Sequence, residues 1–371
     1  MNTIILGAGP TGIAAAHKTG GVIYEETSKP GGICMSYYEE GYRFEKGGGH
    51  WIFGQGDANM LEAIEFMTKF ANLKGYIRRA GVYLNKIYDY PIQNYFGEGP
   101  VNMTEGTMKK WLYDKFGNEQ CKLFFFPFNA KYTAGLYKYV APQDEQKNPV
   151  MNKGYNHEFL YPEKGLDHMI GNMINGLEIH YNKQAIAIDY KQKEVAFADG
   201  TSVKYDRLIS TIPLNRMMKL LSMPENEELP YNSTLVMNIG ATKGKNCPTE
   251  HWLYTPHSKS GFHRVGFYSN VDKSFAPKNR VAIYLEWAFL KEEPTEMHQA
   301  IEELKSWGFI KKVDYFDKHR IDIAYTWNFS DSEVRESFME FIKAAGITQI
   351  GRYGAWKFQG IAESIKDGLS C

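Results

Sequence analysis

Hydrophobic positions recur with two different periods along the chain, and its opening residues combine both. Apolar residues 3–6 predict a strand, small residues from about 12 to 18 predict a helix, and residues 22–25 predict a second strand. Further strands are predicted at 177–181, 185–190, 194–197, 208–210, 234–239, 265–268, 281–289 and 349–350. Helices are predicted at 58–74, 107–116, 297–307 and 334–345 and from residue 360 onward. The aromatic segment 124–139 fits neither period, which predicts irregular structure there.

A glycine-rich turn joins the first strand to the first helix. Gly7, Gly9 and Gly12 have the GxGxxG spacing, which allows a tight turn, a close approach to a pyrophosphate and close helix–strand contact. Free N–H groups at the helix start would face that anion. The second strand ends at Glu25, where an acidic side chain would hold an adenosine ribose. The motif alone also occurs by chance in plain glycine turns, but its position between strand and helix predicts a dinucleotide site.

Three later segments indicate which dinucleotide binds. A second glycine cluster occupies 31–32 and 44–50, where an NAD-binding chain would continue with ordinary strand–helix units. Residues 185–213 form a strand series, and the glycine–arginine segment 351–356 precedes Gly360 and a helix. In this order the segments resemble the FAD-binding flavoprotein superfamily of amine oxidases, protoporphyrinogen oxidases, phytoene desaturases and UDP-galactopyranose mutases. FAD is therefore the expected cofactor.

This resemblance implies an α/β chain in which a Rossmann-like FAD-binding domain carries an inserted helical domain and an antiparallel β-sheet substrate domain. The expected divisions are 1–57, 176–225 and 345–371 for the FAD-binding domain, 58–125 for the helical insertion, and 126–175 with 226–344 for the substrate-binding sheet and active-site wall. The residues expected to contact FAD are Gly7, Gly9, Pro10, Thr11, Gly12, Glu25, Glu26, Gly31, Gly32, Ile33, Gly48, Gly49, His50, Ala185, Ile186, Gly351, Arg352, Gln359, Gly360 and Ile361.

Several segments are similar to the UDP-galactopyranose mutase branch in particular. Residues 251–254 and 262–270 resemble a mutase segment whose arginine grips the nucleotide-sugar diphosphate, so the resemblance gives Arg264 that role. Residues 127–142 resemble the substrate wall of that family, in which a second arginine is replaced here by Lys138. Lysine keeps the positive charge but lacks the bidentate fork of arginine.

Two departures from the mutase pattern affect the expected substrate. Phe358 replaces a tyrosine whose hydroxyl touches the diphosphate, and Tyr132 is the nearest match to a tryptophan of the substrate wall. We therefore expect a relative of the mutases whose substrate differs from plain UDP-galactopyranose.

The resemblance implies an FAD-dependent mutase that interconverts pyranose and furanose forms of a nucleotide-diphosphate sugar through an adduct between the sugar and N5 of reduced FAD. The residues expected in catalysis are His50, Arg264, Lys138, Tyr325, Tyr161 and Tyr132. Arg264 and Lys138 would hold the diphosphate, His50 would lie against the flavin, and the tyrosines would offer hydroxyl groups. NAD(P)H as reductant and a homodimer are compatible with this family, and no metal site is expected.

The amino-acid composition limits the kinds of partner that the protein could bind. The 43 Lys and Arg residues balance 43 Asp and Glu residues, which argues against a general nucleic-acid binder but allows a local positive pocket. Aromatic residues reach 15%, which suits either a pocket for rings and sugars or an aromatic-rich core. The four cysteines have no paired spacing, the first strand leaves no room for a signal peptide, and no apolar run approaches the ~20 residues of a membrane helix. We expect a cytoplasmic protein without a membrane span.

Two other functions remain open from the sequence. A flavin oxidoreductase of the amine oxidase or protoporphyrinogen oxidase type would bind an amine, a porphyrinogen or a polyene, for which Arg264 and Lys138 beside the flavin would be unsuitable. A non-catalytic flavin- or nucleotide-binding protein would retain the same glycine motifs. The redox behaviour discriminates them, because a mutase needs reduced flavin without net substrate oxidation, whereas an oxidase turns over with oxygen.

Overall fold

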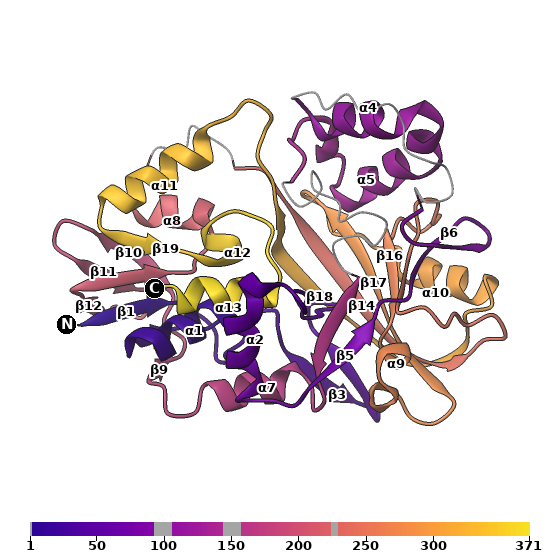
Figure 1. Ribbon diagram of the computed structural model, residues 1–371, viewed down its shortest axis with the longest axis horizontal. Helices are drawn as coiled ribbons and strands as arrows, with labels where there is room; N and C mark the ends of the chain where they lie inside the picture. The colour runs from indigo at the N-terminus through magenta and orange to yellow at the C-terminus, as the bar shows by residue number, and fades with distance from the viewer. Residues whose placement is uncertain (1, 93–105, 144–156, 224–228) are drawn as a thin grey trace.

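The computed structural model describes residues 2–92, 106–143, 157–223 and 229–371. A parallel sheet lies in the half of the molecule that contains both termini, and a larger sheet forms the other half (Figure 1). The parallel sheet has the order β19-β13-β1-β2-β9. Its strands are β1 (Thr3–Leu6), β2 (Val22–Tyr24), β9 (Ile179–His180), β13 (Arg207–Ser210) and β19 (Ile347–Gln349). Because these strands all run in one direction, their carboxyl ends meet at one edge.

Helical elements connect the strands throughout the described part of the chain. The helices are α1 (Pro10–Thr19), α2 (Leu61–Thr68), α4 (Met108–Gln120), α5 (Phe126–Tyr132), α7 (Leu166–Met173), α8 (Leu214–Leu220), α9 (Tyr268–Val271), α10 (Met297–Ser306), α11 (Val334–Ala344), α12 (Gly351–Gly354) and α13 (Ile361–Leu369). Short 3₁₀ segments are η1 (Ala58–Met60), η3 (Leu136–Lys138) and η4 (Lys273–Phe275), and η2 (Cys121–Phe125) is a π-helical turn.

Helices cover both faces of the parallel sheet, because alternate residues of its apolar strands point to opposite sides. Ile5 and Ile209 pack into a core with α1 and α13. Leu6 and Leu208 pack into a second core with α8 and α11, on the opposite side of the sheet in Figure 1. The α1 and α13 helices lie close together because Gly368 has no Cβ atom, which would overlap the backbone oxygen of Thr11.

A seven-stranded sheet forms the other half of the molecule, with the order β18-β14-β17-β16-β15-β6-β7. Its strands are β6 (Ala80–Tyr83), β7 (Ile87–Asp89), β14 (Tyr231–Lys243), β15 (Trp252–Tyr254), β16 (Arg264–Phe267), β17 (Arg280–Phe289) and β18 (Ile310–Thr326). Neighbouring strands are antiparallel except for β15 and β6. The α4 and α5 helices lie over one end of this sheet (Figure 1).

Three smaller sheets complete the described strands. They are the antiparallel set β10 (Ala185–Asp189), β11 (Glu194–Phe197) and β12 (Ser202–Lys204), the pair β3 (Ser36–Glu39) and β4 (Tyr42–Glu45), and the pair β5 (Leu73–Ile77) and β8 (Glu158–Pro162). Among the described helices, none is long and apolar enough to cross a membrane.

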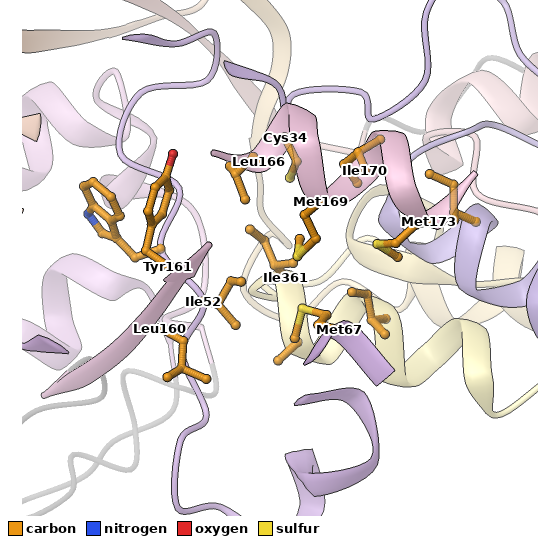
Figure 2. Close-up of a cluster of buried hydrophobic side chains, with 14 of the residues drawn as sticks. Cys34, Ile52, Met67, Leu160, Tyr161, Leu166, Met169, Ile170, Met173 and Ile361 are labelled. Atoms are coloured by element: carbon orange, nitrogen blue, oxygen red, sulfur yellow. The ribbon is translucent and has the colours of Figure 1, made fainter. Parts of the chain in front are cut away.

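A cluster of methionine and aliphatic side chains packs together α2, α7, β8 and the start of α13, which lie between the two large sheets. Met67 of α2 and Met169 and Met173 of α7 converge with Ile361, the first residue of α13, and with Leu160 of β8 (Figure 2). All five side chains are buried. This packing fixes the start of α13, which lies at the edge of a large cleft.

Three predictions about secondary structure are wrong. Residues 124–139 are largely helical rather than irregular, since η2, α5 and η3 follow one another there. Phe124 and Phe125 are consecutive and both buried, because the π-turn replaces the single buried face that helical periodicity would reveal. The helix predicted at 58–74 ends at Thr68 and strand β5 follows it. The region 58–125, predicted to be helical, also contributes β6 and β7 to the seven-stranded sheet.

Candidate active site

A cleft of about 1130 Å³ lies where the carboxyl ends of the parallel strands face the seven-stranded sheet. The residues that follow β1, β2, β13 and β19 all line it, which is the edge where open α/β sheets bind ligands. Residues 320–325 of β18, with Glu286 and Arg264, line the opposite wall. The volume exceeds the roughly 300–1,000 Å³ of pockets for drug-sized ligands, so the cleft has room for a dinucleotide and part of a substrate.

The glycine motif builds the first wall of the cleft. Gly7 has φ +102°, and a Cβ atom there would overlap Thr211, while a Cβ on Gly12 would overlap the backbone oxygen of Gly7. Gly9 is different, because a Cβ there would meet no protein atom within 4 Å although the residue lines the cleft. Gly9 is also the N-cap residue of α1, and no side-chain hydrogen bond caps the first N–H groups of this helix. Bare backbone and uncapped N–H groups at a helix start fit the pyrophosphate of a dinucleotide.

Glu25 lines the cleft but is already hydrogen-bonded within the protein. One carboxylate oxygen accepts from the backbone N–H of Ala8 at 2.7 Å, and the other accepts from the N–H and hydroxyl of Thr27 at 2.9 and 2.7 Å. The buried carboxylate therefore joins the loop after β1 to the loop after β2. The neighbouring Glu26 is exposed and lies 3.5 Å from the guanidinium of Arg216 across the mouth of the cleft.

Most of the predicted cofactor residues are brought together in this cleft. Those that line it are Gly7, Gly9, Pro10, Thr11, Glu25, Glu26, Gly31, Gly32, Ile33, Gly49, His50, Ala185, Gly351, Arg352, Gln359, Gly360 and Ile361. Gly12, Gly48 and Ile186 are not part of the lining. Gly12 packs beneath the first turn, whereas Ile186 follows Ala185 on strand β10 and is 55% exposed.

Within the glycine run 47–49, Gly48 and Gly49 pack against β17. A Cβ on Gly48 would lie 2.6 Å from a carboxylate oxygen of Glu286, and a Cβ on Gly49 would overlap the hydroxyl of Tyr284. These two glycines thus let the chain approach β17 closely, while Gly47 and Gly49 also line the cleft. The next residue, His50, is consequently held beside the wall formed by β16 and β17.

His50 is a neutral imidazole at physiological pH. Burial, together with the nearby guanidinium of Arg352, lowers the pKa of His50 to about 4. Its Nδ1 atom lies 3.2 Å from the carbonyl oxygen of Gly48, which can only accept a hydrogen bond. Nδ1 therefore carries the proton, and Nε2 is left with a lone pair that can accept a hydrogen bond from a ligand.

Arg264 and Glu286 form a buried ion pair on neighbouring strands of the opposite wall. The two residues are directly paired across β16 and β17. Glu286 Oε2 accepts from Arg264 Nε at 2.8 Å and from Nη2 at 2.5 Å. Burial alone would raise the pKa of Glu286, but the charge of Arg264 and the nearby imidazole of His263 outweigh it and hold that pKa below its usual value. The wall thus presents a fixed positive and a fixed negative group side by side.

Arg352 is a second buried cation, and it has aromatic neighbours rather than a carboxylate. Its guanidinium donates to the backbone oxygens of Gln359 and Ala324 at 2.9 and 3.1 Å. The rings of Tyr325, Phe358 and Tyr353 have centroids 5.2, 5.0 and 5.7 Å from its Cζ atom. Burial would lower the pKa of Arg352, yet the tyrosines raise it, so the side chain stays charged. Phe358 thus contributes a ring face where the mutase pattern has a tyrosine.

Three of the predicted catalytic residues do not line the cleft. Lys138 is exposed on the short helix η3 and does not line the cleft, so the geometry gives no support to the expectation that it holds a diphosphate with Arg264. Tyr161 is buried on β8 and donates its hydroxyl to Glu45. Tyr132 lies behind the wall with its ring centroid 4.7 Å from that of Tyr325. His50, Arg264 and Tyr325 do line the cleft.

The lining of the cleft is strongly positive although the whole chain has no net charge. Its basic residues are Lys29, Lys46, Lys183, Arg216, Lys219, Arg264, Arg320 and Arg352, and its acidic residues are Glu25, Glu26, Glu286 and Asp322. Eight cations against four anions leave a net charge of +4. A cleft with a net positive lining attracts anions.

Known proteins share this architecture. Residues 87–244 match the family model described as flavin containing amine oxidoreductase. A crystal structure of reduced UDP-galactopyranose mutase superposes with a TM-score of 0.82 at 22% identity, over 99% of this chain and 94% of that one. The chain has the fold of UDP-galactopyranose mutase. The resemblance to the flavin-containing amine oxidoreductases and the mixed α/β fold class that the motifs indicate are therefore confirmed.

Oxidases also share the fold. A protein from Exiguobacterium sp. 255-15, provisionally named a protoporphyrinogen oxidase, superposes with a TM-score of 0.75 at 16% identity, over 100% of this chain and 97% of that one. Putrescine oxidase bound to putrescine gives a TM-score of 0.67 at 12% identity, again over 100% and 97%. The fold alone thus accommodates both an isomerase and oxidases, and only the residues of the cleft can separate them.

One important residue of the wall, Glu286, was not among the site residues predicted from the sequence. It lies inside the predicted strand 281–289, where it is the single charged residue of an apolar run. That isolation was an available signal, because a lone carboxylate in a buried strand needs a partner. The partner, Arg264, is 22 residues away and is recognisable only once β16 and β17 are paired.

Proposed function

We propose that this protein is an FAD-dependent mutase that interconverts pyranose and furanose forms of a nucleotide-diphosphate sugar. The observation that carries the proposal is the pair of partly buried guanidinium groups, Arg264 on β16 and Arg352 after β19, which line the same cleft as a dinucleotide-type glycine loop. Burial raises the pKa of Tyr132 and of Tyr325, and the charges of both arginines oppose that rise, so the two cations flank the same aromatic surface. A doubly charged diphosphate needs such a surface.

The cleft fits FAD on grounds of its own geometry. The uncapped start of α1 and the open space at Gly9 suit a pyrophosphate, and the backbone at Gly31, Gly32 and Gly351 lines the cleft in the conformation of positive φ. The segment 358–361 would supply backbone groups at the start of α13. When bound and reduced, a flavin supplies an electron-rich nitrogen that can attack an anomeric carbon.

The residues of this chain would bind and orient the substrate around that group. Arg264 would hold the diphosphate while it leaves the sugar and returns to it, and Arg352 replaces Lys138 as the second cation. The neutral His50 would accept a hydrogen bond from a sugar hydroxyl through Nε2. Tyr325 lines the cleft between the two arginines and would pack against the sugar ring.

A flavin oxidoreductase is the second candidate. The oxidases among the structural neighbours favour it, and so does the carboxylate of Glu286, which could attract an amine. The carboxylate is already paired with Arg264, however, and the positive lining would repel a cationic amine. A neutral polyene substrate would gain nothing from these cations.

The test uses the holoprotein under reducing and oxidising conditions. The purified protein is loaded with FAD, reduced with dithionite without oxygen, and incubated with UDP-, dTDP- and GDP-hexopyranoses. Formation of a furanose isomer by the reduced protein, with little or none by the oxidised protein, is the expected result. Oxygen consumption with an amine or a porphyrinogen, without isomer formation, would overturn the mutase proposal in favour of the oxidoreductase.

A further inference from the structure

We propose that Glu286 is a positioning residue that holds the guanidinium of Arg264 so that one edge faces the anion in the cleft. The inference rests on the proposed binding of a nucleotide diphosphate by Arg264. It adds a residue that the sequence motifs did not identify and that is 2% exposed behind the surface of the wall.

The hydrogen bonds between the two side chains decide which edge of the guanidinium is available. Arginine has five N–H donors, one on Nε and two on each terminal nitrogen. Glu286 Oε2 occupies Nε and one N–H of Nη2, which together form the side edge of the group. The donors left over, on Nη1 and the far side of Nη2, form the end edge, and a phosphate accepts two parallel bonds from such an edge.

The surroundings of Glu286 prevent the pair from moving as a unit. A Cβ atom on Gly48 would lie 2.6 Å from Glu286 Oε1, so the glycine run covers that side of the carboxylate. His263 is 1% exposed and places Nε2 3.4 Å from Glu286 Oε2. The ring centroid of Tyr284, which also belongs to β17, lies 5.9 Å from Arg264 Cζ. Arg264 itself is 20% exposed, which leaves room for contact on the cleft side alone.

This arrangement has a cost as well as a benefit. The carboxylate fixes the geometry of Arg264, but its negative charge opposes the anion that Arg264 attracts. The two effects can be separated with neutral side chains of similar size. Glutamine keeps an oxygen that can accept from the side edge of Arg264, whereas methionine has no such acceptor, and neither carries charge. A difference between these two variants therefore measures positioning and not charge.

The experiment is a double-mutant cycle on oxidised holoprotein with UDP as the probe. Glu286→Gln and Glu286→Met are each made in the wild-type chain and in Arg264→Met, and UDP affinity is measured by calorimetry. With Arg264 present, we expect Glu286→Met to bind UDP roughly tenfold more weakly than Glu286→Gln. With Arg264→Met, the two variants should bind equally. Equal binding in the presence of Arg264, or a difference that persists without it, would overturn the inference.

Two further measurements keep the outcomes distinct. FAD content and the midpoint of thermal unfolding are recorded for every variant, and if Glu286→Met does not fold, Glu286→Asp replaces it. Aspartate keeps the charge but withdraws the carboxylate from the side edge, so it should bind UDP several-fold more weakly than the wild type. Wild-type protein that binds no UDP would overturn the inference directly. A cycle that behaves as expected in a protein without mutase activity would overturn the proposed reaction and leave the role of Glu286 intact.

Discussion

Two buried glutamates lie close to the same glycine run, 47–49, and have opposite properties. Glu286 on the cleft wall is 2% exposed, and Glu45 at the end of β4 is fully buried. Burial raises the pKa of Glu45 to about 8, although the hydrogen bonds from Tyr161 and Ser36 act in the opposite direction. The pKa of Glu286 instead lies below its usual value, because Arg264 is in direct contact with it.

The difference shows which glutamate belongs to the site. Glu45 receives hydroxyl donors, with the Ser36 oxygen at 2.8 Å, and its Oε2 has no hydrogen-bond partner among the described residues. The carboxyl group of Glu45 therefore remains protonated at neutral pH and holds the side chain of Tyr161 in the protein interior. Glu286 remains ionised and holds the side chain of Arg264 at the wall of the cleft. The buried side chain of Glu45 thus binds a hydroxyl group, whereas that of Glu286 binds a cation.

Removing the cation should produce the largest effect. Arg264→Ala leaves Glu286 buried without a counter-charge, which costs roughly 3–5 kcal/mol of stability for a broken buried pair. Turnover or substrate affinity should fall roughly 10- to 150-fold, since one charge-assisted contact is lost. Urea unfolding and FAD content measure the first effect, and isomer formation measures the second. The double change Arg264→Met with Glu286→Gln should recover most of the stability. An Arg264→Ala protein as stable as the wild type would contradict the comparison.

The pH dependence of stability should separate the two glutamates by the direction of the change. For Glu45 the folded pKa near 8 lies above the usual 4.5, so the folded protein holds one more proton between these values. Stability should therefore fall as pH rises through that window, by at most about 1.4 kcal/mol per pH unit. Glu45→Gln should remove this loss. For Glu286 the folded pKa is lowered, so its contribution is present above pH 4.5 and is lost in acid.

Unfolding midpoints between pH 3 and pH 9 for wild type, Glu45→Gln and Glu286→Gln test this prediction. Both variants should approach the wild type in acid. At higher pH, Glu286→Gln should be less stable than the wild type and Glu45→Gln more stable. If Glu45→Gln left the alkaline side unchanged, Glu45 would be ionised in the folded protein and the contrast between the two sites would disappear.

Much of the fold could be predicted from the sequence because its signals are local. Strand 3–6, the glycine turn at Gly7 and the helix that follows are neighbours in the chain, and steric limits on the backbone decide them. Strand β18 was missed because most of its side chains are exposed or only partly buried, so its 17 residues give no clear hydrophobic pattern. Residues 124–139 were missed because aromatic side chains are buried without one helical face.

The site was less predictable because its contacts cross strands. Arg264 and His50 were found through motifs, and both line the cleft. Tyr161 was expected to offer a hydroxyl group in the site, but a strand turns alternate side chains to opposite faces, and this one faces Glu45. A sequence motif does not determine which face a residue of a strand presents.

A smaller effect should follow from removing the hydroxyl that fixes Glu45. Tyr161→Phe keeps the ring in the buried aromatic cluster but leaves Glu45 with one side-chain donor. We expect a loss of about 1 to 3 kcal/mol in unfolding free energy, the usual cost of leaving a buried polar group without a partner. UDP affinity should stay within twofold of the wild type, because Tyr161 does not line the cleft. A strong loss of UDP binding with normal stability would return Tyr161 to the site.

The smallest effect should come from a cation that lies outside both glutamate sites. Lys138→Ala removes a charge from η3, where the side chain is exposed and absent from the cleft lining. Exposed charges are largely screened by salt beyond about 10 Å, so UDP affinity at physiological salt should change less than twofold. Arg352→Met is the matched comparison, because it removes one charge from inside the cleft and should weaken UDP binding at least tenfold through lost charge-assisted contacts. Calorimetric titration of both variants tests the pair. If Lys138→Ala weakened UDP binding as much as Arg352→Met, η3 would have to approach the ligand in the bound protein. The helix would then belong to the binding site.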